Sequence, residues 1–170
     1  ASGAVTLQLN RNYPSGTWET IGSTSADTLS WLVTAPASSN ARFRVTLNSN
    51  STIGDSTGNE NIVLPSITLT APNGADQIRQ TTSTNVTWTR SNLTGGVRVE
   101  FNPNYPSANW TTLATGITGN SYSWNVTQDP TTTARVRVVY ENVPSYADTS
   151  NANFTIFRPE LTLVSPVGGE

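Results

Sequence analysis

The chain repeats itself, and the length of the repeat limits the folds that it can adopt. The stretch NYPSGTW at 12–18 returns as NYPSANW at 104–110, which is five identical residues in seven at a distance of 92 positions. The match extends in both directions, and its period drifts between about 92 and 94 residues. A period of this length is the size of one β-sandwich domain. The sequence therefore predicts tandem copies of one small unit.

Further matched segments place the boundaries of the copies. The pairs are 5–18 with 97–110, 29–34 with 122–127, 41–45 with 134–138, 54–64 with 147–156, and 67–76 with 161–170. With the proline before the last pair as a boundary, we expect 1–64 to be the C-terminal part of a first repeat that lacks its first strands. Residues 65–158 are then a complete repeat, and 159–170 the first strand of a following one. A strand from upstream chain or from another molecule should cover the gap in the first copy.

Apolar residues alternate with polar ones along the complete repeat, and no window has the spacing of an amphipathic helix. Proline and glycine separate the alternating segments, as is typical of turns. The pattern predicts about seven strands in two antiparallel sheets, with Trp31, Trp88 and Trp124 in the core. The inward rows are Ile67 and Leu69; Val86 and Trp88; Val97, Val99 and Phe101; Trp110 to Leu113; Tyr122, Trp124 and Val126; Val136 and Val138; and Phe154 and Ile156.

The composition excludes most kinds of catalytic centre. The chain has no histidine, cysteine or methionine, and all nine of its cations are arginines. It therefore lacks a histidine base, a thiol nucleophile and the usual transition-metal ligands, and we predict no cofactor, no metal site and no enzyme activity. The net charge is −2 with both signs interspersed, so we expect no nucleic-acid partner. No apolar run has the length that a membrane span requires.

The opening of each repeat resembles a known group of proteins. The segments APNGAD (71–76) and SPVGGE (165–170) are similar to the Ser-Pro-Asn-Gly-Gly-Glu-like start of immunoglobulin-like or fibronectin-III-like tandem repeats in large secreted and surface proteins of bacteria. The chain is also similar to the Ser/Thr-rich repeats of cell-wall-anchored proteins. The resemblance implies an all-β protein of tandem immunoglobulin-like antiparallel β-sandwich domains, located outside the cell or at its surface. It implies a spacer, adhesion or assembly role, and it carries no catalytic residues over.

Four aromatic residues in the repeated hairpin are candidates for a ligand site. Tyr13 with Trp18, and Tyr105 with Trp110, could form a platform on which a sugar ring stacks. The alternative is a proline-containing hairpin turn whose rings cover the end of the core. Exposure of the two indoles distinguishes the two interpretations. If the rings are open, the partner that we predict for them is a surface glycan.

Charged residues in the strands and turns have two interpretations each. Asp55 and Asp148 could join a calcium site, but neither has a second acid within four residues, and an Asx-type turn is the expected structure. The arginine pairs 42/44 and 135/137 could hold an anionic glycan, although simple alternation on an exposed strand face also explains them. Arg98 and Glu100 flank an inward valine, so pairing of exposed arginine and glutamate across strands is expected to contribute little stability.

Three classes of function remain open on the sequence alone. The first is a non-catalytic structural module of a surface protein, stalk or filament, whose partners are neighbouring repeats or identical subunits. The second is a carbohydrate-binding or adhesive module, and the third is an accessory region of a secreted enzyme. Within the first class, residues 158–170 could leave their own domain and complete the open sandwich of the next molecule by strand addition. Such a contact would give a head-to-tail polymer.

Overall fold

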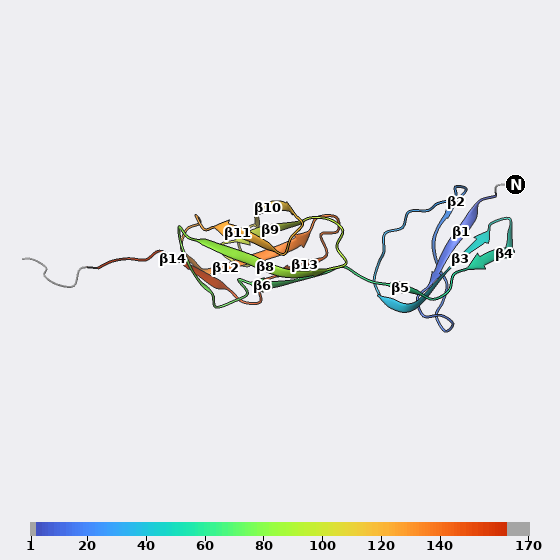
Figure 1. Ribbon diagram of the computed structural model, residues 1–170, viewed down its shortest axis with the longest axis horizontal. Helices are drawn as coiled ribbons and strands as arrows, with labels where there is room; N and C mark the ends of the chain where they lie inside the picture. The colour runs from blue at the N-terminus through green and yellow to red at the C-terminus, as the bar shows by residue number, and fades with distance from the viewer. Residues whose placement is uncertain (1–2, 163–170) are drawn as a thin grey trace, which may run out of the picture. The chain divides into compact units, whose positions relative to one another are not determined.

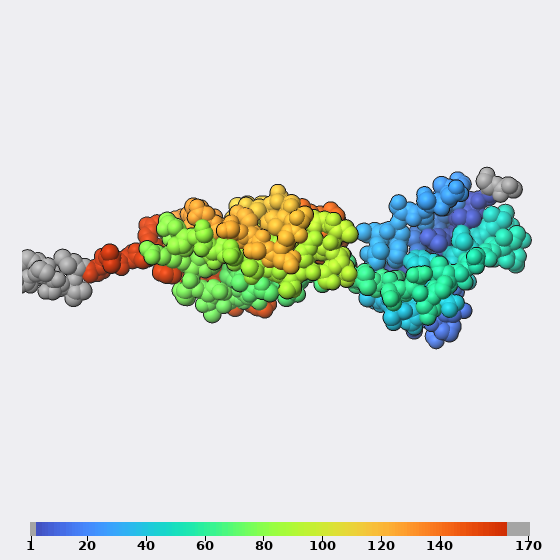
Figure 2. All heavy atoms as spheres, in the orientation of Figure 1, coloured from blue at the N-terminus to red at the C-terminus, as the bar shows by residue number. Residues whose placement is uncertain are grey.

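A computed structural model describes residues 3–162 of the chain, and within this range it contains strands and turns but no helix (Figure 1). The chain divides into two compact units, Ala1–Leu64 and Pro65–Glu170, here called unit 1 and unit 2. Each unit forms its own body of packed atoms in the space-filling view (Figure 2). The all-β class predicted from the alternation is confirmed.

Unit 2 is a two-layer sandwich. One sheet has the order β10-β9-β12-β14-β7 with β13 paired to β12, and the other has the order β11-β8-β6. All pairs are antiparallel except that of β14 with β7. The strands are β6 (Ser66–Ala71), β7 (Gln77–Arg79), β8 (Ser83–Ser91), β9 (Val97–Asn102), β10 (Thr111–Ile117), β11 (Ser121–Asn125), β12 (Thr131–Tyr140), β13 (Ala147–Thr149) and β14 (Phe154–Phe157).

The core of unit 2 lies between these sheets and follows the predicted alternation. Trp124 is 1% exposed, and its ring contacts Phe101 at a centroid distance of 5.2 Å and Phe154 at 6.3 Å. The predicted strands are all present, but the three-residue strands β7 and β13 are additional. Strands this short contain too few residues for an alternation to be visible. The buried residues of the predicted rows are Leu69, Val86, Trp88, Val97, Val99, Phe101, Trp124, Val126, Val136, Val138, Phe154 and Ile156.

Unit 1 is a single sheet in the order β2-β1-β3-β4, with β5 paired to β3. Its strands are β1 (Val5–Asn10), β2 (Glu19–Thr24), β3 (Ser38–Leu47), β4 (Asn50–Ser56) and β5 (Glu60–Ile62). The fully buried core contains Leu9, Ala41 and Ile62, against which the partly buried Trp31 and Phe43 pack. Strand order and hairpins correspond to those of β10, β9, β12, β13 and β14 in unit 2.

One matched segment differs between the units. Residues 29–34 correspond in sequence to 122–127, where β11 forms, but they form no strand in unit 1. The reason is the pairing partner: β11 pairs with β8, and the described part of unit 1 contains no counterpart of β8. Leu32 and Val33 in this segment are exposed, and Trp31 is only partly buried rather than sealed in a core.

Candidate functional site

The hairpin that joins β9 to β10 is organised by one buried amide. Asn102 is 1% exposed, and its Nδ2 donates to the carbonyl of Ala108 at 2.6 Å. Its Oδ1 accepts from the backbone N–H of Asn104 at 3.0 Å, and Asn104 in turn accepts from the N–H of Ala108 at 2.9 Å. These bonds satisfy backbone groups in a turn that includes a cis Tyr105–Pro106 peptide. The side chain of Asn102 therefore fixes the turn in place of a backbone ladder.

The aromatic residues of this hairpin lie under arginines from the neighbouring strand β12. The guanidinium carbon of Arg135 lies 4.3 Å from the ring centroid of Tyr105, and that of Arg137 lies 4.4 Å from the ring centroid of Trp110. The two rings are 6.0 Å apart. Arg135 and Arg137 are two residues apart on one strand, so they share one face of the sheet. We call these four side chains the Arg–aromatic ladder of unit 2.

Unit 1 builds the same ladder from Tyr13, Trp18, Arg42 and Arg44. The guanidinium carbons of Arg42 and Arg44 lie 4.1 Å and 4.2 Å from the ring centroids of Tyr13 and Trp18, and the rings are 6.3 Å apart. The amide of Asn10 holds the turn as Asn102 does, with bonds of 2.7 Å and 3.0 Å to the same two backbone positions. Residues 92 or 93 positions apart in the chain therefore make matching contacts.

The ladders explain what the arginine pairs do, which the sequence did not indicate. Stacking a guanidinium on an aromatic ring is favourable, by about 0.5–2 kcal/mol. All four rings are partly buried, and a guanidinium covers a face of each. This arrangement agrees with the interpretation of the hairpin as a packed turn, and glycan stacking through these rings stays a prediction. The signal that could have indicated the ladder is the Arg-x-Arg pattern that recurs with each Tyr/Trp hairpin.

Next to the ladder of unit 2 lies a carboxylate that is buried rather than exposed. Glu100 is 6% exposed and pairs with Arg98 at 2.9 Å and with Arg137 at 2.5 Å. The cross-strand pairing was expected, but its exposure was predicted wrongly, because Arg98 and Arg137 each lie against one oxygen of the Glu100 carboxylate. Burial by itself raises the pKa of the Glu100 carboxyl, but the hydrogen bonds and charges of Arg98 and Arg137 outweigh it and hold the pKa below its ordinary value.

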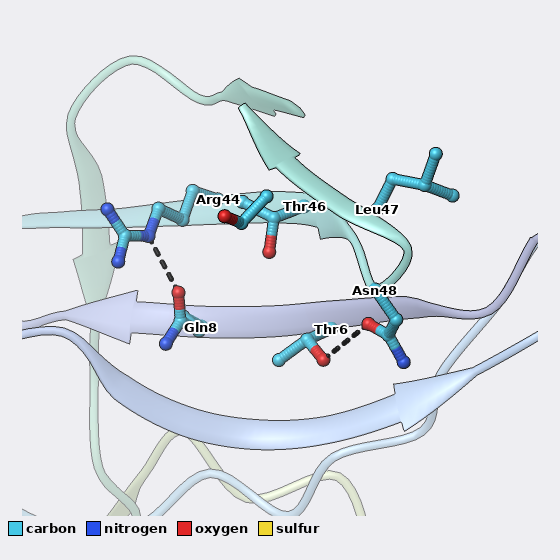
Figure 3. A pocket seen from close by; sticks show the side chains of 7 residues that line it. Thr6, Gln8, Arg44, Thr46, Leu47 and Asn48 are labelled. Atoms are coloured by element: carbon cyan, nitrogen blue, oxygen red, sulfur yellow. Dashed lines mark hydrogen bonds between the residues drawn. The ribbon is translucent and has the colours of Figure 1, made fainter. Parts of the chain in front are cut away.

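The corresponding position in unit 1 is neutral and borders a polar pocket. Arg44 Nε donates to Gln8 Oε1 at 2.7 Å, where Arg137 meets Glu100 in unit 2. The pocket, of about 510 Å³, is also lined by Thr6 and Asn48, and Thr6 Oγ1 donates to Asn48 Oδ1 at 2.7 Å (Figure 3). Its polar groups bond to one another across β1 and β3, and it contains no carboxylate and no residue with an activated nucleophile.

The two aspartates singled out from the sequence are not in Asx-type turns. Asp148 lies in β13, where its Oδ1 accepts from Thr149 N–H at 3.0 Å and its Oδ2 accepts from Leu69 N–H at 2.8 Å. Asp55 lies in β4, where its Oδ1 accepts from Ser56 N–H at 2.8 Å. The predicted turn is therefore wrong, because strand pairing places both residues in extended backbone. Asp148 instead connects β13 to a strand of the opposite sheet.

No group of three or more acidic, histidine or cysteine side chains that could hold a metal ion is found between residues 3 and 162. Over the same range no helix is long and apolar enough to cross a membrane.

No protein-family model matches the chain, and no curated protein matches it. The chain is similar to a structure described as fibronectin(III)-like modules of CbhA from Clostridium thermocellum, with 16% identity and a TM-score of 0.36. The match covers 92% of this chain and 79% of that one.

The arrangement of strands defines the class of protein. In unit 2, two mainly antiparallel sheets of short strands face each other across a core of alternating inward residues, which is the architecture of an immunoglobulin-like or fibronectin-III-like β-sandwich. Such sandwiches serve many functions, so the role of this chain has to be argued from its surfaces and not from its fold.

Proposed function

We propose that the chain is a non-catalytic structural repeat module of an extracellular surface protein, stalk or filament. The observation that carries the proposal is that two successive units use corresponding residues to build the same Arg–aromatic ladder, from Tyr13 to Arg44 and from Tyr105 to Arg137. The duplicated feature stabilises each unit and is not a reaction centre. Repeat proteins of this kind are expected to serve as structural elements built from stacked copies. The chain is rich in Thr, Ser and Asn and only 12% of its residues are charged, a composition that suits a protein located outside the cell.

The second candidate function, here called the runner-up, is that of a carbohydrate-binding or adhesive module, or of an accessory region of a secreted enzyme. Sugar stacking needs an open aromatic face, and in both units a guanidinium lies over each candidate ring. The geometry therefore favours the structural role.

A glycan-binding screen distinguishes the two roles. The structural role predicts that the full chain binds no neutral or acidic glycan above the level of a matched blank surface. Glycan binding that is lost on both Trp18→Ala and Trp110→Ala, with circular dichroism unchanged, would contradict the structural role and establish the runner-up.

We also propose that the modules associate head to tail by β-strand addition through residues 159–170. Support comes from the two inner sheet faces: that of unit 2 is covered by β6, β8 and β11, whereas the described part of unit 1 has a single sheet. Contacts of this kind join different surfaces of identical molecules, so they produce open chains. Sedimentation velocity of the full chain over a wide concentration range should show mass increasing with concentration. Removal of residues 159–170 should abolish the increase, and unchanged association after removal would exclude this mode.

A further inference from the structure

Unit 2 shows how its first strand, β6, is held against the rest of the sandwich. Leu69 is 1% exposed and lies in the same core cluster as the inward valines of β9 and β12, Val99, Val136 and Val138. β6 also lies against β13, where the Leu69 N–H donates to Asp148 Oδ2 at 2.8 Å. The apolar side chains of Leu69 and the partly buried Ile67, together with one charge-assisted hydrogen bond, therefore hold β6 against the rest of the sandwich.

Unit 1 contains counterparts of these contact residues but, among its described residues, no strand like β6. The matched positions are Leu7 for Val99, Phe43 for Val136 and Val45 for Val138. All three are only partly buried, although their counterparts in unit 2 are 3% exposed or less. A cavity of about 240 Å³, lined mainly by apolar surface, lies between Leu7, Phe43, Val45 and Asp55. The cavity therefore lies among the counterparts of Val99, Val136 and Val138, which share a core cluster with Leu69 in unit 2, and beside Asp55, the counterpart of the aspartate that bonds to Leu69.

The acceptor of the missing hydrogen bond is present as well. Asp55 matches Asp148, and its Oδ1 accepts from the next residue's N–H just as Oδ1 of Asp148 does, with distances of 2.8 Å and 3.0 Å. Oδ2 of Asp148 accepts from Leu69, whereas Oδ2 of Asp55 has no hydrogen-bond donor among the described residues. Asp55 is exposed on β4. The carboxylate of Asp55 thus lies at the edge of the cavity, and its Oδ2 is free to accept the kind of hydrogen bond that Oδ2 of Asp148 accepts from Leu69.

The cavity and the carboxylate of Asp55 together are here called the slot of unit 1. We propose that residues 159–170 of a second copy occupy this slot, in the way that β6 packs on the opposite sheet of unit 2. Leu163 then lies in the cavity, and its N–H donates to Asp55 Oδ2. This inference rests on the head-to-tail association proposed above and assigns its docking site. The segment 159–164, PELTLV, matches PSITLT at 65–70, so Leu163 corresponds to Leu69 and Leu161 to Ile67. Leu161 is fully exposed in its own chain, and residues 163–170 lie outside the described residues.

An added strand makes fewer contacts in the slot of unit 1 than β6 makes in unit 2. β6 also pairs with β8, which has no counterpart in the described part of unit 1, so the incoming strand is held by its leucines and by Asp55. Apolar contact and one charge-assisted bond give modest affinity. Association is therefore expected between about micromolar and millimolar concentrations, and it should be read from a concentration series and not from one sample.

The first test places matched changes in the full chain. Asp55→Ala should weaken self-association about tenfold, because a charged acceptor is lost, and the double variant Leu161→Ser with Leu163→Ser should abolish it. Asp27→Asn, which also removes one exposed negative charge from unit 1, and Thr162→Ser, at an outward position of the segment, are controls that should leave association unchanged. Circular dichroism of every variant verifies that the sheets are intact.

The second test isolates a single hydrogen bond. The synthetic peptide RPELTLVSPVGGE should inhibit association of the full chain, and the same peptide with an N-methyl group on the leucine that corresponds to Leu163 should inhibit about tenfold less, because it lacks the N–H donor. Methylation at the residue that corresponds to Val167 is the matched control.

The outcomes separate this inference from the proposed function. Association that is unaffected by Asp55→Ala and by the leucine double variant overturns the slot and leaves the structural role standing. A full chain that stays monomeric over the whole series and binds no peptide overturns both the slot and head-to-tail assembly. Glycan binding through the two tryptophans overturns the structural role alone.

Discussion

At the scale of single residues, this chain depends on arginine as its only cation. Four of its nine arginines stack on the rings of the two ladders. A guanidinium is planar and weakly hydrated, so it lies flat on a ring while its edge still donates hydrogen bonds, which a lysine ammonium does not do. Arg137 does both, with Trp110 beneath it and Glu100 at its edge. Arg44 repeats the stacking over Trp18 but meets the neutral Gln8.

The buried carboxylate makes the stability of unit 2 depend on pH. The pKa of Glu100 is lower in the folded state than in the unfolded chain, so the ion pairs stabilise the fold above the unfolded pKa. This stabilisation is lost as the pH falls through the lower, folded pKa. We expect Glu100→Gln to lower the free energy of unfolding by about 1–3 kcal/mol at neutral pH.

Urea unfolding of both proteins between neutral pH and about pH 3 checks this expectation. The difference between wild type and Glu100→Gln should shrink once the pH falls below about 4. A difference that stays constant across the range would show that the carboxylate's charge contributes nothing.

A second prediction at this scale concerns two tryptophans with different surroundings. Trp124→Ala should cost about 3–5 kcal/mol, because a buried indole leaves a cavity between Phe101 and Phe154. Trp110→Ala should cost about 1–2 kcal/mol, since this partly buried ring loses mainly its stacking on Arg137 and Tyr105. Chemical denaturation followed by circular dichroism measures both, and equal costs would contradict the assignment of Trp110 to a surface ladder.

At the scale of the structural element, the β9–β10 hairpin combines a buried polar clamp with an aromatic cover. The amide of Asn102 pairs with groups at both sides of the turn, and the turn in consequence presents Tyr105 and Trp110 to the arginines of β12. The β1–β2 hairpin of unit 1 repeats the arrangement through Asn10. The hairpins retain their geometry although the opposite layer differs between the units, because their contacts are made within one sheet.

Asn102→Ala tests the clamp. The substitution leaves the Ala108 carbonyl and the Asn104 N–H without their partner, and we expect a loss of about 2–3 kcal/mol in the free energy of unfolding. Asn109→Ala, at an exposed position of the same hairpin, is the control and should change stability by less than about 0.5 kcal/mol. Similar losses for the two variants would mean that the buried amide does not organise the turn.

At the scale of the whole molecule, the two units differ in how much apolar surface they bury. Unit 2 encloses a core cluster that both of its sheets contribute to, whereas the core of unit 1 contains Leu9, Ala41 and Ile62 beneath one sheet. Because burial of apolar area is the main stabilising contribution, unit 1 by itself should be the less stable.

Hydrogen exchange measures this difference directly. Amides in the paired strands β1 and β3 should have protection factors at least about tenfold lower than those in β9 and β12. The peptide RPELTLVSPVGGE should raise protection in β3 and β4 without affecting β9. Equal protection in the two units would contradict the view that the sheet of unit 1 is incompletely covered.

Much of the fold could be predicted from the sequence, and the misses have identifiable causes. Alternation located the inward rows because a strand places every second side chain on one face. The similarity of 29–34 to 122–127 did not reveal that 29–34 forms no strand. A strand also needs a neighbour to pair with, and the neighbour of β11 is β8. The burial of Glu100 was missed because part of its cover comes from Arg137, which lies on another strand, β12.

The candidate site was predicted in part. The sequence singled out Tyr13, Trp18, Tyr105 and Trp110 as a repeated set, and the structure brings each pair together. It did not indicate that arginines from another strand lie over these rings, since cross-strand register depends on turns and pairing that a linear pattern does not encode.

The sequence by itself determined the period of the chain, its all-β class and the absence of the residues that most catalytic centres require, because these depend on local alternation and on residue types. Only the tertiary structure decided which charges are buried, which rings are covered, and that an apolar cavity lies beside Asp55, the counterpart of the aspartate that bonds to Leu69 in the other unit. The physical reason is that burial and hydrogen bonding belong to pairs of distant residues, and such pairs exist only once the sheets have formed.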